Sequence, residues 1–125
     1  NAIDWGLKKQ YQNLVEYVKG LIALRKAYPQ FCFGKADLVR EHLSFLENEE
    51  PSALGFRLTA PDSTQEIYVL INGEREAVSF SVPQGEYTIL ANGEKVCPKG
   101  LSTLNIGSEN SLSLQPIEAL ILLRK

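Results

Sequence analysis

Residues that support metal, redox or catalytic chemistry are scarce in this 125-residue sequence. It contains one histidine, His42, and two cysteines, Cys32 and Cys97. A structural zinc site is built from about four cysteine or histidine ligands, so these residues argue against one, and no metal or cofactor is expected. Two cysteines are also too few to indicate a disulfide scaffold, and we expect them to pack as small hydrophobic side chains rather than to pair.

An excess of one charge and a long hydrophobic run are also missing. The 13 basic and 15 acidic side chains give a formal net charge of -2, which argues against a nucleic-acid partner. No polybasic segment, apolar run of about 20 residues or signal peptide is present, so no membrane partner is expected. The sequence lacks methionine, and we therefore expect position 1 to lie within a longer or processed protein, whether cytoplasmic or secreted.

The first clear pattern is an amphipathic helix between Tyr11 and Tyr28. It ends before Pro29, because a residue that precedes proline disfavours the helical conformation. At about 100° per residue, its apolar arc runs from Leu24 round to Val15 and spans about 180°, whereas a one-sided helix needs little more than about 100°. We therefore expect this helix to contact two partners. The apolar positions are Tyr11, Leu14, Val15, Val18, Leu21, Ile22 and Leu24.

Arg25 interrupts this apolar arc between Leu14 and Val18. A guanidinium at that position must extend to solvent or find a carboxylate or carbonyl partner. One interpretation is a local ion pair, and the other is an ion pair with protein that lies outside this chain.

Beyond residue 30 the pattern changes to that of strands. Residues 36–42 are predicted as one short helix, and from Leu43 onward the apolar period falls to two. Ile67–Ile71 and Ala119–Leu123 are continuously apolar and are predicted as central strands. Turn residues recur about every ten residues, with Asn72-Gly73 as a hairpin signal. The predicted fold class is α+β, in which an N-terminal amphipathic helix precedes a mostly antiparallel β-sandwich of about seven or eight strands.

A search for catalytic residues finds little. His42 lies in a polar stretch beside Glu41 and is interpreted as a surface residue rather than a base. Cys97 has no neighbouring histidine or second cysteine that would indicate a nucleophile. Asp4 beside Trp5 resembles the acidic and aromatic pair of a sugar site.

A carbohydrate-binding module would present exposed aromatic rings on the sandwich, because rings stack on sugar faces. The aromatic side chains of this region are interpreted mainly as core residues. They are Phe45, Phe56, Tyr68, Phe80 and Tyr87.

Two stretches carry a resemblance to a known family. Residues 1–5 (NAIDW) and 15–29 (VEYVKGLIALRKAYP) resemble the C-terminal end of bacterial pullulanases, the debranching enzymes of the α-amylase superfamily. Val18 stands where the family has a second tyrosine, and Tyr28 where it usually has histidine. The later stretches that fit the family's β domain are His42-Leu43, Tyr68–Asn72, Val82–Tyr87 and Pro116–Leu123.

The resemblance implies three parts. Residues 1–29 would be the last loop and helix of a TIM-barrel catalytic domain, 30–35 a connector, and 36–125 the C-terminal β-sandwich. Family enzymes hydrolyse α-1,6-glucosidic links in pullulan and branched α-glucans, and their catalytic carboxylates lie on earlier barrel strands, so no catalytic residue is assigned here. Asn1 and Asp4 are candidates for a substrate-side role at the mouth of the barrel. Contact with the barrel is assigned to Trp5, Leu14, Val18, Leu21 and Arg25.

The leading hypothesis is therefore a non-catalytic C-terminal portion of a pullulanase-type glycoside hydrolase that packs against its barrel and stabilises it. We expect this chain alone to be inactive, and to self-associate through the exposed helix. One alternative is a starch- or glucan-binding β-sandwich module, because sandwiches support many binding functions. Another is a free-standing interaction domain that uses the helix as its docking surface.

Overall fold

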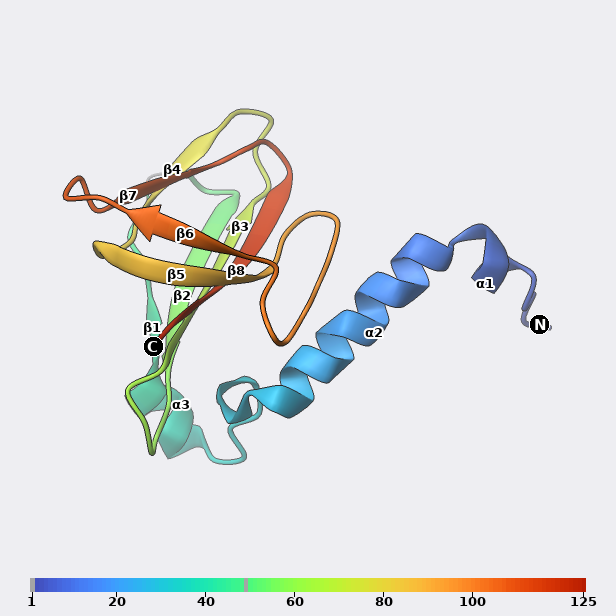
Figure 1. Ribbon diagram of the computed structural model, residues 1–125, viewed down its shortest axis with the longest axis horizontal. Helices are drawn as coiled ribbons and strands as arrows, with labels where there is room; N and C mark the ends of the chain where they lie inside the picture. The colour runs from blue at the N-terminus through green and yellow to red at the C-terminus, as the bar shows by residue number, and fades with distance from the viewer. Residues whose placement is uncertain (1, 49) are drawn as a thin grey trace.

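A computed structural model describes residues 2–48 and 50–125 as an N-terminal helical region followed by a β-sandwich (Figure 1). This confirms the predicted α+β class. The helices are α1 (Leu7–Gln10), α2 (Gln12–Ala27), the 3₁₀ turn η1 (Pro29–Phe31) and α3 (Ala36–His42). The strands are β1 (Leu43–Phe45), β2 (Ala53–Thr59), β3 (Glu66–Asn72), β4 (Val78–Ser81), β5 (Gly85–Ala91), β6 (Ser102–Ile106), β7 (Ser111–Leu114) and β8 (Glu118–Arg124).

The strands form two sheets in which every pairing is antiparallel. The larger sheet has the order β1-β2-β3-β8-β5-β6, and β4 and β7 form the smaller one. The two continuously apolar stretches, β3 and β8, lie side by side at the centre of the larger sheet, as predicted. Their side chains are apolar on both faces because both faces of the sheet are covered.

The larger sheet has an inner face, which packs on β4 and β7, and an outer face, which packs on the helical region. The inner face contributes Tyr68, Leu122 and Tyr87 to a core with Phe80 and Leu114 of the smaller sheet. The outer face contributes residues such as Leu58, Ile67 and Leu123 to a second core, which Leu24 of α2 and Phe31 of η1 complete. The end of α2 is therefore part of the sandwich's own packing.

The prediction of a hairpin at Asn72-Gly73 is wrong, because β3 pairs with β2 and β8 while β4 pairs with β7. The chain instead crosses here from one sheet to the other. Asn72 is buried, and its amide nitrogen donates to the backbone oxygens of Glu76 and Gln115 at 2.9 and 3.0 Å. The backbone at Gly73 lies so close to Ser52 that a larger residue would not fit, because its Cβ would lie 2.7 Å from the Ser52 carbonyl oxygen. The Asn72 side chain therefore connects β3 to the segments that flank β4 and β7.

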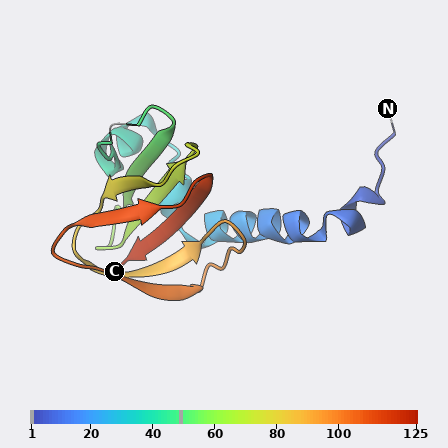
Figure 2. The ribbon, with the colours of Figure 1, turned by 90° about the horizontal axis from the view of Figure 1, so that it is seen from above.

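Most of α2 extends away from the sandwich, and α1 lies at its far end (Figures 1 and 2). Within the residues that the structure describes, no helix is long and apolar enough to cross a membrane.

Candidate interdomain surface

The helix α2 is attached to the sandwich by the loop between β5 and β6, residues 92–100. The Tyr17 hydroxyl donates to the Asn92 carbonyl oxygen at 2.6 Å, and the Tyr28 hydroxyl donates to the Pro98 carbonyl oxygen at 2.8 Å. Between them, Gly20 lies so close to Val96 that a Cβ would come within 2.7 Å of the valine Cβ. Glycine is thus the residue that lets the helix backbone approach the loop.

Leu24 lies on the same side of α2 and is only 2% exposed. At about 100° per residue, Tyr17, Gly20, Leu24 and Tyr28 form one face of the helix. Burial, followed by the nearby Cys97, raises the pKa of the Tyr28 hydroxyl above its ordinary value, so this group stays protonated as a hydrogen-bond donor. The sandwich and its 92–100 loop therefore cover this side of the wide apolar arc.

The rest of the apolar arc is exposed. It continues from Leu21 through Leu14 and Val18 to Ile22, and Leu14 is 61% exposed. Further apolar side chains extend this surface toward the N-terminus, and Trp5 is 73% exposed there. We call this the helix surface, and its members are Ile3, Trp5, Leu7, Tyr11, Leu14, Val18, Leu21 and Ile22.

Arg25 lies in the middle of the helix surface and is exposed. Its Nη2 atom contacts the Cys32 sulfur at 3.7 Å, and none of its atoms lies within ion-pair distance of a carboxylate in residues 2–48 and 50–125. The interpretation of a local ion pair is therefore wrong for the described part of the chain. The guanidinium charge remains available to a carboxylate outside it.

Of the two candidates for a substrate-side role, Asn1 lies outside the described residues. The Asp4 carboxylate accepts a hydrogen bond from the Gly6 amide at 2.9 Å, and the Asp4 carbonyl accepts one from the Leu7 amide at 3.2 Å. Aspartate commonly closes a turn in this way. The structure therefore gives Asp4 a local role at the start of α1.

Two sequence interpretations of the scarce residues need correction. His42 is not a surface residue, because its side chain is only 12% exposed, stacks near Phe33 and contacts the Thr59 hydroxyl at 2.9 Å through Nδ1. Cys32 does not pack as a small hydrophobic side chain but is exposed, while Cys97 is half-buried, and both are free thiols. In the part of the chain that the structure describes, no three His, Cys, Asp or Glu side chains are grouped to hold a metal ion.

The interpretation of the sandwich aromatics as core residues holds for Tyr68, Phe80 and Tyr87, which are buried, and is wrong for Phe45. Phe45 is 68% exposed because β1 is an edge strand whose outer face extends beyond the helical cover. Its ring packs edge-on against Phe56 with centroids 6.4 Å apart. With Leu54 and Ile71, which lie opposite each other on β2 and β3, these rings form a second exposed apolar area, here called the outer-face strip.

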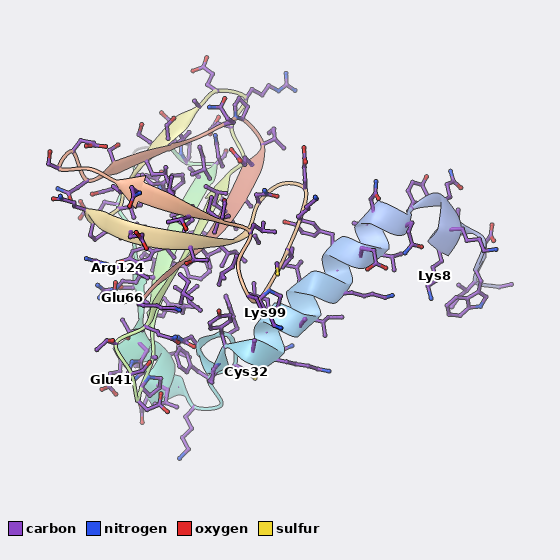
Figure 3. All side chains as sticks on the ribbon, viewed as in Figure 1. Lys8, Cys32, Glu41, Glu66, Lys99 and Arg124 are labelled. Carbon is purple, nitrogen blue, oxygen red and sulfur yellow. The ribbon has the colours of Figure 1, made fainter. Side chains whose placement is uncertain are left out.

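A polar cluster that no sequence pattern indicates lies at the open end of the inner face. Arg57 of β2 lies opposite Tyr68 of β3, and Glu66 of β3 lies opposite Arg124 of β8. In Figure 3 the labelled Glu66 and Arg124 lie next to each other at this end of the sheet. Burial, with the adjacent Glu66 carboxylate, raises the pKa of the Tyr68 hydroxyl well above its ordinary value.

Comparisons with known proteins agree with this architecture. A family model described as the pullulanase all-beta domain matches residues 39–95. The pullulanase of Bacillus subtilis (strain 168) is 30% identical over 86 residues, a match that covers 66% of this chain and 12% of that protein.

Solved structures extend the likeness to the helical region. The pullulanase from Bacillus acidopullulyticus matches 99% of this chain and 15% of its own, with a TM-score of 0.84 and 28% identity. The type I pullulanase from Bacillus subtilis str. 168, complexed with maltose, matches 98% of this chain and 17% of its own, with a TM-score of 0.78 and 24% identity. The chain thus spans less than a fifth of these relatives. On the match at residues 39–95 and the shared fold, the chain is similar to pullulanases and corresponds to their C-terminal all-beta domain region.

Proposed function

We propose that this chain is the non-catalytic C-terminal portion of a pullulanase-type glycoside hydrolase and that it packs against the catalytic barrel and stabilises it. In this assignment residues 1–29 belong to the last loop and helix of the barrel, 30–35 connect, and 36–125 form the sandwich. The observation that carries the proposal is the helix surface, because α2 is apolar well beyond the face that the sandwich covers.

The charge on α2 supports the same partner. Arg25 is surrounded by exposed apolar side chains, and a guanidinium in such a place is stabilised when the surface is covered by protein that supplies a carboxylate. A barrel helix packed on Leu14, Val18 and Leu21 would bring such a side chain to Arg25. Trp5 then adds a large apolar contact at the far end of the surface.

The outer-face strip gives the barrel a second place to pack. Phe45, Leu54 and Ile71 are exposed on the face of the sheet on which α2 also packs. A contiguous exposed apolar area of this kind is typical of a contact with another protein surface. A barrel held by both surfaces would fix the sandwich in position as well as cover it.

The simplest test is activity. Hydrolysis of a glycosidic bond needs two carboxyl groups placed on either side of it, and the described residues bring no such pair together at the helix surface. The purified chain incubated with pullulan is expected to release no maltotriose. Release of maltotriose that scales with the concentration of the chain would contradict the proposal.

The exposed ring of Phe45 favours one other function, glucan binding by the sandwich, because a flat aromatic surface can stack on a sugar. Affinity electrophoresis in amylopectin distinguishes the two functions. Barrel packing predicts unchanged mobility, whereas a glucan-binding module predicts retardation that Phe45→Ala abolishes and Phe31→Ala, which alters the outer-face core instead, does not.

A further inference from the structure

Arg57 and Arg124 share a single carboxylate at the open end of the inner face. Arg57 Nη1 lies 3.7 Å from Glu66 Oε1, and Arg124 Nη1 lies 3.8 Å from Glu66 Oε2. Both separations exceed hydrogen-bond length. The acceptor capacity of Glu66 is used instead by the Tyr68 hydroxyl, which donates to Oε2 at 2.7 Å. Within the described part of the chain, two positive charges therefore face one negative charge, and neither arginine has a close bidentate partner.

The two arginines differ in what else they contact. Arg124 donates from Nη2 to the Gln84 carbonyl oxygen at 3.2 Å, and its guanidinium lies 5.8 Å from the centroid of the Tyr87 ring. Arg57 lies close enough to the Tyr68 hydroxyl to favour its ionised form, and within residues 2–48 and 50–125 its Nε atom is buried without a hydrogen-bond partner. A buried donor left unpaired is costly. Arg57 is consequently the arginine whose donors remain to be satisfied.

Arg57 lines a groove of about 490 Å³ between the two sheets. The groove is also lined by Ser44 and Ser81, whose hydroxyls add polar groups, by Asn110, and by the apolar Leu46 and Pro83. Among the residues that the structure describes, no acidic side chain lines it. Its volume is in the range of small-molecule sites, of about 300–1,000 Å³, and its mixture of apolar walls and a few polar groups is typical of them.

We propose that this groove binds a small monocarboxylate, which Arg57 holds through its guanidinium. The planar fork of a guanidinium matches a carboxylate in two parallel hydrogen bonds, which here would come from Nη1 and Nη2 because Nε is buried. The single excess positive charge fits a monoanion. The short apolar body of the ligand would lie against Leu46 and Pro83.

Two neighbouring features restrict the ligand. Beyond Ser81 and Asn110 a second groove begins, and it is lined by the acidic Glu47, Glu50 and Glu109. These carboxylates would repel a second negative charge, so a dicarboxylate or a long anion is disfavoured. A neutral glucan is disfavoured because Tyr68, the one aromatic side chain in the Arg57 groove, is fully buried and presents no ring face.

The test is an NMR titration of the chain with sodium butyrate, with butyramide as the neutral molecule of the same shape. Butyrate is expected to shift the backbone amide signals of Ser44, Arg57 and Ser81 to saturation, and butyramide to leave them in place. Arg57→Gln removes the charge and is expected to weaken butyrate binding about tenfold or more, as for loss of a charged hydrogen-bond partner. Arg57→Lys retains the charge without the fork and is expected to weaken it too.

Glu66→Gln provides a variant with the opposite expected effect. Its amide oxygen still accepts the Tyr68 hydroxyl, but the competing negative charge is gone, so butyrate should bind several-fold more tightly. Arg40→Gln is the matched control, because Arg40 is exposed on α3 and pairs with Asp37 away from the groove. Its butyrate affinity should equal that of the unchanged chain. Thermal melting of each variant shows that it is folded before its titration is interpreted.

Several results would overturn the proposal. Equal shifts with butyramide, or unchanged affinity in folded Arg57→Gln, would show that the guanidinium holds no carboxylate. Tighter binding of inorganic phosphate than of butyrate would make the groove a general anion site. Saturable shifts of the same amides by maltotriose would make it a sugar site instead.

Discussion

The Tyr17 hydroxyl donates a hydrogen bond of 2.6 Å to the Asn92 carbonyl oxygen, across 75 positions of sequence. This contact, the Gly20–Val96 approach and the Tyr28–Pro98 hydrogen bond hold α2 against the 92–100 loop. Figure 3 shows Lys99 of this loop beside the helix. Because the helix surface lies on the same rigid element, these contacts set the angle at which that surface leaves the sandwich.

Gly20→Ala tests the close approach. In an exposed helix this substitution would stabilise by up to about 1 kcal/mol, but here the new Cβ would lie 2.7 Å from Val96 Cβ and 3.1 Å from its carbonyl oxygen. We expect overpacking to prevail, with a net loss of about 1–2 kcal/mol. Hydrogen exchange of the α2 amides should accelerate accordingly. Gly34→Ala, where a Cβ meets nothing within 4 Å, should leave it unchanged; slower exchange in Gly20→Ala would refute the account of this contact.

Tyr17→Phe tests the hydrogen bond alone, because the ring is retained. Loss of one such bond is expected to cost about 1 kcal/mol, measured as faster hydrogen exchange at Val96 and along α2. The control is Tyr11→Phe, since Tyr11 is exposed on the helix surface and its hydroxyl contacts the neighbouring Gln10 side chain. If both variants exchange at the same rate as the unchanged chain, the hydroxyl contact does not hold the helix.

Alkaline pH should destabilise the fold through its buried tyrosines. The pKa values of Tyr68, Tyr87 and Tyr28 are raised above the ordinary value of 10.0, in each case mainly by burial. Below pH 10.0 the tyrosines are protonated in both states, whereas above it the unfolded chain loses protons that the folded chain keeps. The free energy of unfolding should therefore fall as pH rises past that value, by up to about 1.4 kcal/mol per pH unit for each such tyrosine.

Urea unfolding between pH 9 and 11 measures this effect. Tyr87→Phe should reduce the slope above pH 10.0, because one buried ionisable hydroxyl is removed. A stability that is flat with pH in the unchanged chain would contradict the assignment of protonated buried tyrosines.

The sequence predicts those helices and strands whose apolar pattern is long enough to recognise without knowing which neighbouring elements pack against them. The helix α2 and the central strands β3 and β8 were predictable, because each has a long run of apolar residues whose spacing is visible in the sequence alone. The edge strands β1 and β6 were not, since they are short and largely exposed.

Arg57 shows a second limit. In the alternating stretch of β2, Leu54, Phe56 and Leu58 indicate the buried face, and Arg57 reads as a solvent-facing residue. The structure covers both faces of this sheet, so the residues between the apolar ones face β4 and β7 instead. The Arg57–Glu66–Arg124 cluster joins three strands, and only the strand order β2-β3-β8 brings it together. No local sequence pattern indicates this strand order.

The helix surface predicts self-association of the isolated chain, because nothing in the described residues covers it. Sedimentation velocity should show dimers or larger species that increase with concentration. Val18→Asp, in the middle of the surface, should shift the chain toward monomer, whereas Ala23→Asp, on the polar side of the same helix, should not. A chain that stays monomeric at high concentration would contradict this prediction.

The most direct measurement of the central claim is the association of this chain with the catalytic barrel of a pullulanase, produced separately and mixed with it in a sedimentation experiment. The account predicts a one-to-one complex that Val18→Asp and Arg25→Glu weaken and Ala23→Asp leaves intact. Independent sedimentation of the two polypeptides would contradict the account, as would a complex whose affinity is unchanged by Val18→Asp and Arg25→Glu.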